Sequence, residues 1–300
     1  MNNKFLCNSI EIDLSSTLDG GQSFRWHKFE NGFNGVINNK PYFIFQENKK
    51  IFVEAEELNS NDVDLVFNYL SLDVDLRKIS KKFKNNLYLN NLFKKYYGLR
   101  ILNQDPWETI VSFITSSVSN ILKIKKNIND LCVLNGEKIG KNQYDYAFPG
   151  PIKIIDFGEN NLRKIGFGFR SPYIIDACKK VINGDILINN IYDLNYDDAL
   201  HQLTKINGVG RKVADCILTY GYHRKDVFAV DRWVRRGLIN KLGYSEKLQN
   251  EKLSIKARKK YGNESSYIQQ YIFFGEKSKI LNFFKYLISS FFDFSKPLNL

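Results

Sequence analysis

The strongest restriction on the fold of this chain is a glycine turn between two segments of helical periodicity. An apolar-periodic segment from Ala199 to Ile206 runs into Asn207-Gly208-Val209-Gly210, and a second helical pattern begins at once and continues to Tyr222. Glycine lets the backbone turn where a Cβ atom would clash. The sequence therefore predicts a helix-hairpin-helix over residues 199–222, with the N–H groups of the second helix's first turn open to an anion such as a DNA phosphate.

Two side chains with complementary chemistry accompany this hairpin. Lys212 stands in the first turn of the second helix, and Asp231 follows the apolar run Val227-Phe228-Ala229-Val230. An amine that titrates readily when desolvated is a candidate nucleophile, and a carboxylate beside it is able to stabilise a cation. The pair marks this region as a candidate catalytic site.

The stretches GVGRKVADC (208–216) and AVD (229–231) resemble the catalytic core of the helix-hairpin-helix DNA glycosylase superfamily. The resemblance implies that Gly208, Val209 and Gly210 bind the DNA backbone, that Lys212 attacks the sugar and that Asp231 assists. A glycine turn alone also occurs in non-catalytic DNA-binding proteins. The lysine and the aspartate at this spacing make the signal specific.

Length and charge agree with a globular DNA-binding protein. The chain has 300 residues, of which 43% are hydrophobic, enough for a sizeable core. Lys and Arg outnumber Asp and Glu by 44 to 32, which gives a net charge of +12. A basic chain attracts polyanions through long-range fields and counterion release. A compositional bias of the genome would produce the same excess, so charge alone leaves the question open.

Cysteine usage and hydropathy restrict the setting of the chain. The four cysteines are too scattered for a metal cluster, and we expect them to be reduced thiols: Cys7, Cys132, Cys178 and Cys216. The N-terminus lacks the apolar region of a secretory signal, and no uncharged apolar stretch reaches the roughly 18 residues of a membrane span. The apolar segment from Ile280 to Phe292 is interrupted by Lys285 and predicts a core helix. We therefore expect a protein without a membrane partner, located in the cytoplasm and on the nucleoid if the source is prokaryotic.

The N-terminal third has the pattern of short hairpins. Hydrophobic alternation around 33–36, 42–45 and 51–53 is punctuated by Asn-Gly, Asn-Asn and Asn-Lys-Lys, which predicts an antiparallel sheet. Helical patterns follow from Asn61 to Leu70 and onward to Tyr97. The sequence predicts a β-rich module over residues 1–100, made of this sheet and helices.

GQSFRW (21–26) gives a second and more discriminating resemblance, to the N-terminal signature of 8-oxoguanine DNA glycosylases within the same superfamily, and Tyr69 to Leu76 is similar to that family's stretch closing the sheet module. The resemblance implies that the carbonyl of Gly21 accepts a hydrogen bond from N7–H of the oxidised base, a donor that guanine lacks. An acceptor left unpaired by guanine costs about 1–3 kcal/mol. The alternative is that Gly21 forms an ordinary turn at a strand end.

The rest of the chain, residues 101–300, is predicted to be helical. Asp105-Pro106-Trp107 is typical of a helix start. Helices are expected at about 106–117, 120–134, 172–183, 196–206, 211–222 and 231–242, with a final group from 246 to 292. The fold class is α+β, an N-terminal antiparallel sheet module followed by an all-helical helix-hairpin-helix glycosylase domain. The resemblance implies an active-site cleft between the two halves of that domain, where a flipped nucleotide sits.

Helical spacing supports a base-binding set. Lys212 and Cys216 are four residues apart, as are Gln269 and Phe273, so each pair lies on one helix face. The resemblance implies that Cys216 and Phe273 sandwich the flipped base and that Gln269 reads its Watson–Crick edge. Because the chain has 23 phenylalanines, Phe273 as an ordinary core residue is the alternative.

The resemblance also implies further DNA contacts, and here the chain departs from the family. Its better-known members have an asparagine run and then an arginine that hold the cytosine opposite the lesion. This chain has Val118, Asn120 and Lys123 in that region, Arg170 matches a second such arginine, and Phe169 is a candidate intercalating wedge. Trp233 stands where those members have a histidine near a phosphate. Because Val118 and Lys123 do not supply the same bidentate contacts, we predict a weaker preference for cytosine.

Cofactors follow only from the resemblance. Backbone carbonyls equivalent to those of Thr204, Ile206 and Val209 ligate a monovalent cation in relatives, and side chains do not decide whether this chain does so. No cofactor is expected to be required. No iron–sulfur cluster is expected, because the four-cysteine loop of endonuclease III-type glycosylases is absent.

These observations predict a monomeric DNA repair glycosylase and AP lyase. It would flip 8-oxoguanine out of double-stranded DNA, excise it through a lysine Schiff base and nick the strand by β-elimination. One alternative is an endonuclease III-like glycosylase for other oxidised bases, although the cysteine pattern opposes it. Alkyl-base glycosylases of the same fold typically lack the lysine. A non-catalytic helix-hairpin-helix DNA-binding protein is the remaining alternative, and it leaves Lys212, Asp231 and GQSFRW unexplained.

Overall fold

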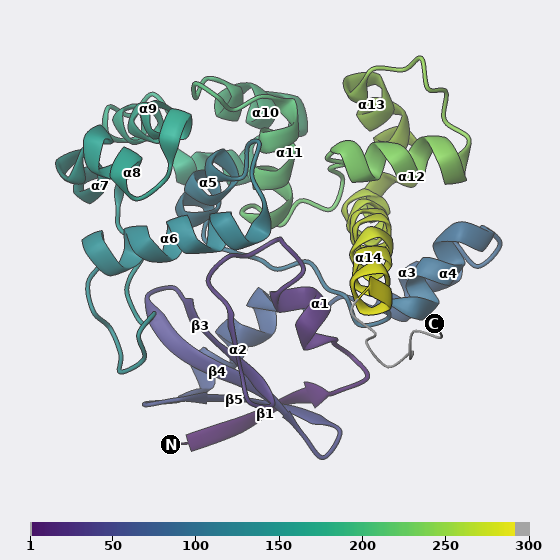
Figure 1. Cartoon of the computed structure of the whole chain (residues 1–300), viewed down its shortest axis with the longest axis horizontal. Helices are drawn as coiled ribbons and strands as arrows, with labels where there is room; N and C mark the ends of the chain where they lie inside the picture. Colours follow the sequence, from purple (N-terminus) through teal and green to yellow (C-terminus); the bar gives the residue numbers. More distant parts are fainter. Residues whose placement is uncertain (1, 292–300) are drawn as a thin grey trace, which may run out of the picture.

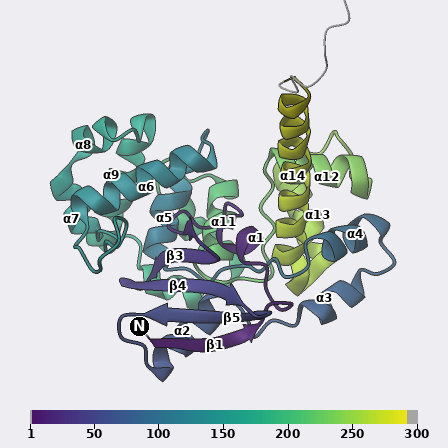
Figure 2. The same cartoon turned by 60° about the horizontal axis from the view of Figure 1, so that its bottom comes forward.

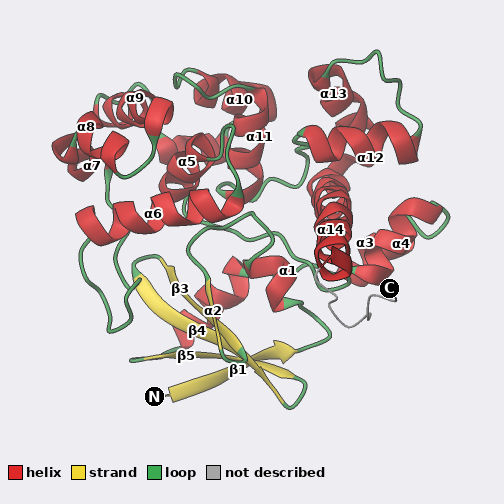
Figure 3. Cartoon of the chain, in the orientation of Figure 1, coloured by secondary structure: helices red, strands yellow, loops and turns green. Residues whose placement is uncertain are grey.

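The computed structural model describes the backbone of residues 2–291 and the side chains of residues 3–279. Five strands near the N-terminus form one antiparallel sheet in the order β1-β5-β4-β3-β2 (Figure 3). The strands are β1 (Asn2–Asn8), β2 (His27–Phe29), β3 (Gly32–Ile37), β4 (Lys40–Glu47) and β5 (Lys50–Ala55). The predicted hairpins correspond to β3, β4 and β5. The outer strands β1 and β2 were not predicted, because the first is rich in Asn and Lys and the second is only three residues long.

Tight turns fix the register of this sheet. Ile37 pairs with Lys40, and Glu47 pairs with Lys50, so each hairpin is closed by two residues. Those residues are Asn38-Asn39 and Asn48-Lys49, and all four have positive φ angles between 47° and 61°. Both central positions of a type I′ turn need positive φ, which asparagine tolerates better than most residues. The asparagine-containing pairs between the predicted strands are therefore the residues that form these turns.

The remaining described elements are helical. Their bounds are α1 (Leu14–Leu18), α2 (Ser60–Tyr69), α3 (Leu76–Lys82), α4 (Leu87–Lys95), α5 (Pro106–Thr115), α6 (Ile121–Asn135), α7 (Pro151–Phe157), α8 (Glu159–Lys164), η1 (Gly168–Arg170), α9 (Ser171–Ile182), η2 (Ile188–Asp193), α10 (Tyr196–Thr204), α11 (Arg211–Tyr220), α12 (Arg232–Leu242), α13 (Asn250–Tyr261), η3 (Gly262–Glu264) and α14 (Ser265–Phe291). The short helices α7 and α8 were not among the predicted elements. The α+β fold class is confirmed.

Two hydrophobic cores organise the molecule. The smaller lies between the sheet and α2, around Trp26, Ile44 and Val53. The larger joins the helices, and it also takes in α3 and α4, which pack beside α14 (Figures 1 and 2). The ring of Phe93 on α4 lies 4.3 Å, centroid to centroid, from that of Tyr271 on α14. The two helices at the end of the predicted β-rich module therefore brace the C-terminal helix, while the division of the chain near residue 100 stays a prediction.

The long helix α14 completes the fold. Its backbone is helical to Phe291; Phe292 and the side chains from Ile280 onward, part of the predicted apolar core helix, lie outside the described residues. Within the described residues, no helix combines the length and apolar character needed to span a bilayer. Figure 1 shows α1 between the sheet and α14, with the hairpin helices α10 and α11 on the far side from the sheet. The loop that follows α1 thereby meets α14.

Candidate active site

The predicted hairpin is present, and its second helix begins without a side-chain cap. Gly208 has φ +80°, and a Cβ atom built on it would lie 2.3 Å from Cδ2 of Tyr173. The N–H of Val209 donates to the carbonyl of Ile206 at 3.0 Å, which closes the turn. Gly210 is the N-cap of α11 and offers no side chain to the first-turn N–H groups. The first turn of α11 is therefore open to an external anion.

Lys212 and Cys216 share the inner face of α11, as their spacing predicted. The Nζ atom of Lys212 lies 5.9 Å from the ring centroid of Phe113, and Cys216 is buried one turn later. Burial raises the pKa of the Cys216 thiol to about 11, although the charge of Lys212 opposes this shift. Cys216 is thus a neutral thiol at physiological pH, suited to apolar contact rather than to nucleophilic attack.

Asp231 follows a buried segment that is neither helix nor strand. All four residues of 227–230 are buried, and Asp231 follows them as the N-cap of α12. Its Oδ1 atom accepts hydrogen bonds from the N–H groups of Trp233 at 2.9 Å and Val234 at 2.8 Å. Burial raises the pKa of the Asp231 carboxyl, while these N–H groups and the charge of Lys212 oppose the rise. The carboxylate is therefore held rigidly within the electrostatic reach of the amine.

The GQSFRW segment joins the sheet module to the helices. Gly21 has φ +98°, and Gln22 is buried beside it. The Nε2 atom of Gln22 donates to the carbonyls of Thr17 at 2.8 Å and Arg100 at 2.7 Å, and its Oε1 accepts from the N–H of Leu102 at 2.9 Å. A side chain that forms three buried hydrogen bonds fixes the backbone on either side of it. Gln22 therefore holds Gly21 in place.

The same segment enters both cores. Phe24 belongs to the helical core and Trp26 to the sheet core. Between them, Arg25 is buried and pairs with Glu108 of α5, with Nη1 3.2 Å from Oε2. The segment therefore links the two cores.

Helix α14 presents a third group of predicted residues next to Gly21. Gln269 is 4% exposed, and its Oε1 atom has no hydrogen-bond partner within the described residues. Phe273, one turn later, is half-buried against the helical core. A Cβ atom built on Gly21 would lie 3.5 Å from the Nζ atom of Lys277, and that atom is 5.5 Å from the ring centroid of Phe273. The Gly21 loop and the Gln269–Phe273 face thus meet, and a buried acceptor without a partner suits a ligand with N–H donors.

Comparison with known proteins identifies the family. The family model for the N-terminal domain of 8-oxoguanine DNA glycosylase matches residues 4–110. The N-glycosylase/DNA lyase of Saccharomyces cerevisiae is 32% identical over 263 residues, which cover 78% of this chain and 69% of the yeast protein. The chain belongs to the 8-oxoguanine DNA glycosylase/lyase family.

Other members of this glycosylase family agree in sequence and in fold. A probable N-glycosylase/DNA lyase of Methanothermobacter thermautotrophicus is 28% identical over 88% of this chain and 93% of its own length. The Clostridium acetobutylicum 8-oxoguanine glycosylase/lyase, solved with double-stranded DNA carrying cytosine opposite 8-oxoguanine, is 30% identical with a TM-score of 0.84 over 90% of this chain and 93% of that one. The similarity therefore extends over both the sheet and the helices.

The residues predicted to hold the base opposite the lesion are engaged within the protein. Asn120 is the N-cap of α6, and its Oδ1 accepts from the N–H of Lys123 at 3.0 Å. Arg170 is buried, and its guanidinium donates to the backbone carbonyls of Ser117 and Val118. In the described structure Arg170 therefore supports this loop from beneath. A direct contact of Arg170 or Asn120 with DNA stays a prediction.

Two aromatic side chains in the predicted DNA interface are accessible. Phe169 is 50% exposed, as an intercalating wedge requires, and the guanidinium of Arg170 lies 4.4 Å from its ring centroid. Trp233 is half-buried at the start of α12 beside Arg232. Val118 is 92% exposed with φ +50°, a strained angle for a β-branched residue. Strain of this kind is concentrated at functional sites.

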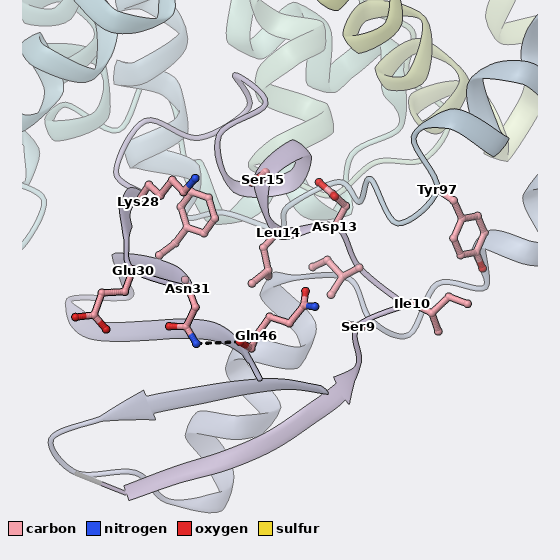
Figure 4. A pocket seen from close by; sticks show the side chains of 13 residues that line it. Ser9, Ile10, Asp13, Leu14, Ser15, Lys28, Glu30, Asn31, Gln46 and Tyr97 are labelled. Atoms are coloured by element: carbon pink, nitrogen blue, oxygen red, sulfur yellow. Dashed lines mark hydrogen bonds between the residues drawn. The ribbon is translucent and has the colours of Figure 1, made fainter. Parts of the chain in front are cut away.

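Other candidate ligand sites have less support. Within the described residues, no group of three or more His, Cys, Asp or Glu side chains is arranged to hold a metal. The carbonyl of Ile206, one of the predicted cation ligands, already accepts a hydrogen bond from Val209, which leaves it a second lone pair. A surface hollow of about 470 Å³ lies beside the sheet, where Asn31 donates to the carbonyl of Gln46 at 2.9 Å (Figure 4). The lining of this hollow includes none of the predicted site residues.

Two residues next to the predicted site residues were not predicted to have a role there. Gln22 lies within the GQSFRW signature, and its hydrogen bonds come from segments distant in sequence. Lys277 continues the four-residue spacing of Gln269 and Phe273, and this spacing is the sequence signal that points to it.

Proposed function

We propose that this chain is a bifunctional DNA glycosylase and AP lyase that removes 8-oxoguanine from double-stranded DNA. The observation that carries the proposal is the placement of Lys212 within electrostatic reach of Asp231, whose carboxylate is fixed by two backbone N–H groups, in a chain with more than 30% identity to an N-glycosylase/DNA lyase. The open N-terminus of α11 binds a backbone phosphate, and the net charge of +12 favours the duplex.

The flipped base would be bound between the three segments that meet here. Cys216 and Phe273 contact its two faces, and the Oε1 atom of Gln269 accepts from its Watson–Crick edge. The carbonyl of Gly21 accepts from N7–H of 8-oxoguanine, and guanine leaves that acceptor unpaired. Gln22 makes this discrimination effective, because a fixed carbonyl does not move away from a mismatched base.

The reaction is carried out by Lys212, in the first turn of α11, and by Asp231, the N-cap of α12. The lone pair of the Lys212 amine attacks C1′, and the bond from C1′ to N9 breaks with its electron pair leaving on the base. Asp231 stabilises the cationic sugar and moves protons, a role suited to a carboxyl whose pKa burial raises. The opened sugar forms a Schiff base with Lys212. Loss of a proton from C2′ then expels the 3′ phosphate and nicks the strand, and water releases the enzyme.

Borohydride trapping tests this proposal. The natural protein is incubated with a duplex containing one 8-oxoguanine, and the variants Lys212→Gln and Lys256→Gln are treated in parallel. Lys256 is an exposed lysine on α13, so its replacement removes the same charge away from the site. A covalent adduct is expected with the natural protein and with Lys256→Gln. No adduct is expected with Lys212→Gln or with an undamaged duplex.

The remaining outcomes separate the alternatives. An adduct formed only on oxidised pyrimidines would place the chain with the endonuclease III type. Tight, salt-sensitive binding without adduct or base release would indicate a non-catalytic DNA-binding module. A monovalent cation at the carbonyls of Thr204, Ile206 and Val209, a monomeric state, the lack of a required cofactor and a cytoplasmic location are further parts of the proposal.

A further inference from the structure

The proposed site contains a second lysine, whose amine has no role in the proposed mechanism. Lys277 is one turn beyond Phe273 on α14, and its Nζ atom reaches the Gly20-Gly21 loop. Burial lowers the pKa of this amine, the charges of Asp19 and Asp231 oppose the shift, and the charge of Lys125 adds to it. Lys277 is therefore within electrostatic reach of the carboxylate that acts with Lys212.

Within the residues whose side chains are described, the amine of Lys277 forms no ion pair. The carboxylate of Asp19, whose charge acts on Lys277, is bound by Lys125, with Nζ 2.5 Å from Oδ1. The hydrogen bond from Lys277 to the carbonyl of Gly20 is long, at 3.4 Å. Lys277 is half-buried, and an ammonium has three N–H donors that cost free energy when they are left unpaired away from water. The other lysine on this stretch behaves differently, because Lys279 binds Glu276 at 2.6 Å.

The neighbours of Lys277 indicate which groups its N–H donors face. Lys277 contacts Phe273, and it lies beside the glycine whose carbonyl is assigned to N7. Gln269, Phe273 and Lys277 recur every four residues, so one helix face offers an unpaired acceptor, an aromatic ring and a cationic donor. In 8-oxoguanine the carbonyl oxygens O6 and O8 stand on either side of N7. These oxygens are acceptors that a donor next to Gly21 would reach.

We infer that Lys277 is a base-recognition residue that donates a hydrogen bond to a carbonyl oxygen of the flipped 8-oxoguanine next to N7. This inference rests on the proposed function of the same site. A charged hydrogen bond in a desolvated site is stronger than a neutral one, so Lys277 contributes more to holding the base than a polar uncharged residue would. Its contribution ends once the base has left.

The test compares base excision with nicking of a duplex that already carries an abasic site. Lys277→Met keeps the length of the side chain and removes its donors, and Lys279→Met is the matched control on the same helix. Single-turnover excision of 8-oxoguanine is expected to fall about 10- to 100-fold in Lys277→Met, the range for a hydrogen bond to a charged group. Nicking of the abasic duplex is expected to stay within about 2-fold, because no base is present to be recognised. Lys277→Arg should recover part of the excision rate.

The outcomes distinguish this inference from the proposed function. If the natural protein does not excise 8-oxoguanine, the proposed function fails before Lys277 is tested. If it does, an unchanged rate in Lys277→Met overturns the inference. An equal loss of abasic nicking also overturns it, because it indicates a structural or DNA-binding role. A duplex with 8-oxoadenine, which lacks O6, locates the contact: a comparable loss assigns it to O8, and no loss assigns it to O6.

Discussion

Helices α11 and α12 each carry one of the two proposed catalytic residues at their start, but their first turns differ in chemistry. Gly210 begins α11 without a side-chain cap, so its first N–H groups are open. Asp231 begins α12, and its own carboxylate accepts hydrogen bonds from the first N–H groups there. Both helix ends carry a partial positive charge that favours an anion. The anion at α11 is expected from DNA, whereas the anion at α12 is part of the protein.

This difference shows how one structural principle serves two steps of a reaction. An open helix start binds a phosphate and positions the substrate. The N-cap Asp231 keeps a partly buried carboxylate fixed, although burial raises its pKa. The two starts would be interchangeable if capping were only a matter of helix stability.

The largest effect is expected from Asp231→Asn. Asparagine caps a helix about as well as aspartate, so the free energy of unfolding should change by less than about 1 kcal/mol. The negative charge is lost, and single-turnover excision should fall about 100- to 1000-fold, since fixed charges at the reaction centre contribute about 3–4 kcal/mol. Excision rates measured beside thermal unfolding separate the two roles.

Asp105→Asn is the matched control for that measurement. Asp105 caps α5 through a hydrogen bond of 2.8 Å from the N–H of Glu108, and it is exposed. This variant should leave excision nearly unchanged. If Asp231→Asn lowered stability and left the rate intact, Asp231 would be a cap and nothing more.

A smaller effect is expected when α11 is made to resemble α12. Gly210 has extended backbone angles, and no atom of the described residues lies within 4 Å of a Cβ atom built on it, so Gly210→Asp is accommodated. The new carboxylate would cap α11 and raise the free energy of unfolding by a few tenths of a kcal/mol. It would also occupy the anion site, so binding of duplex DNA should weaken by about 10-fold, or 1.4 kcal/mol. Titrations at several salt concentrations measure this.

Gly210→Ala, which adds a Cβ atom and no charge, controls for the loss of glycine. The dependence of log K on log salt should also become shallower by about one phosphate in Gly210→Asp. Equal weakening in the two variants would mean that the backbone, not the open N-terminus, is what DNA needs at this position.

The contrast also explains which parts of the molecule the sequence predicted. Lys212, Asp231 and the glycine turn lie close together along the chain, and local spacing places them correctly. Asp231 caps α12 through hydrogen bonds from residues two and three positions later, so this role is also local. A carboxylate just before a helical pattern is a sequence signal for such a cap. The meeting of Gly21 with Lys277 could not be predicted, because it depends on how the loop after α1 packs against α14; Gly20 and Lys277 are 257 residues apart in sequence.

Arg170 shows a different limit of sequence reasoning. A motif match assigns it to DNA, but the structure shows its guanidinium on the carbonyls of Ser117 and Val118. Residue type and position in a motif do not reveal whether donors are already used. Hydrogen-bond partners decide this, and they come from tertiary structure.

The smallest effect concerns a third helix start, that of α6, where the base opposite the lesion is expected. Asn120 is used as its cap, Arg170 is used beneath it, and Val118 is exposed without polar atoms in its side chain. The guanidinium of Arg170 is therefore already used, which leaves the amide N–H groups of Asn120 and the amine of Lys123, rather than a planar guanidinium, to recognise cytosine. We expect excision rates with cytosine and with the other three bases opposite 8-oxoguanine to differ by less than about 10-fold, or 1.4 kcal/mol.

The double variant Val118→Asn with Lys123→Arg tests the converse expectation, that added donors increase the preference for cytosine. Asparagine tolerates the φ angle of +50° at position 118 better than valine does, so the loop should keep its shape or gain stability. The added amide and guanidinium supply donors in a planar arrangement that suits a base edge. The preference for cytosine should increase in single-turnover rates measured with each opposite base. High selectivity in the natural protein would contradict the interpretation, and it would mean that Arg170 leaves the carbonyls of this loop when DNA binds.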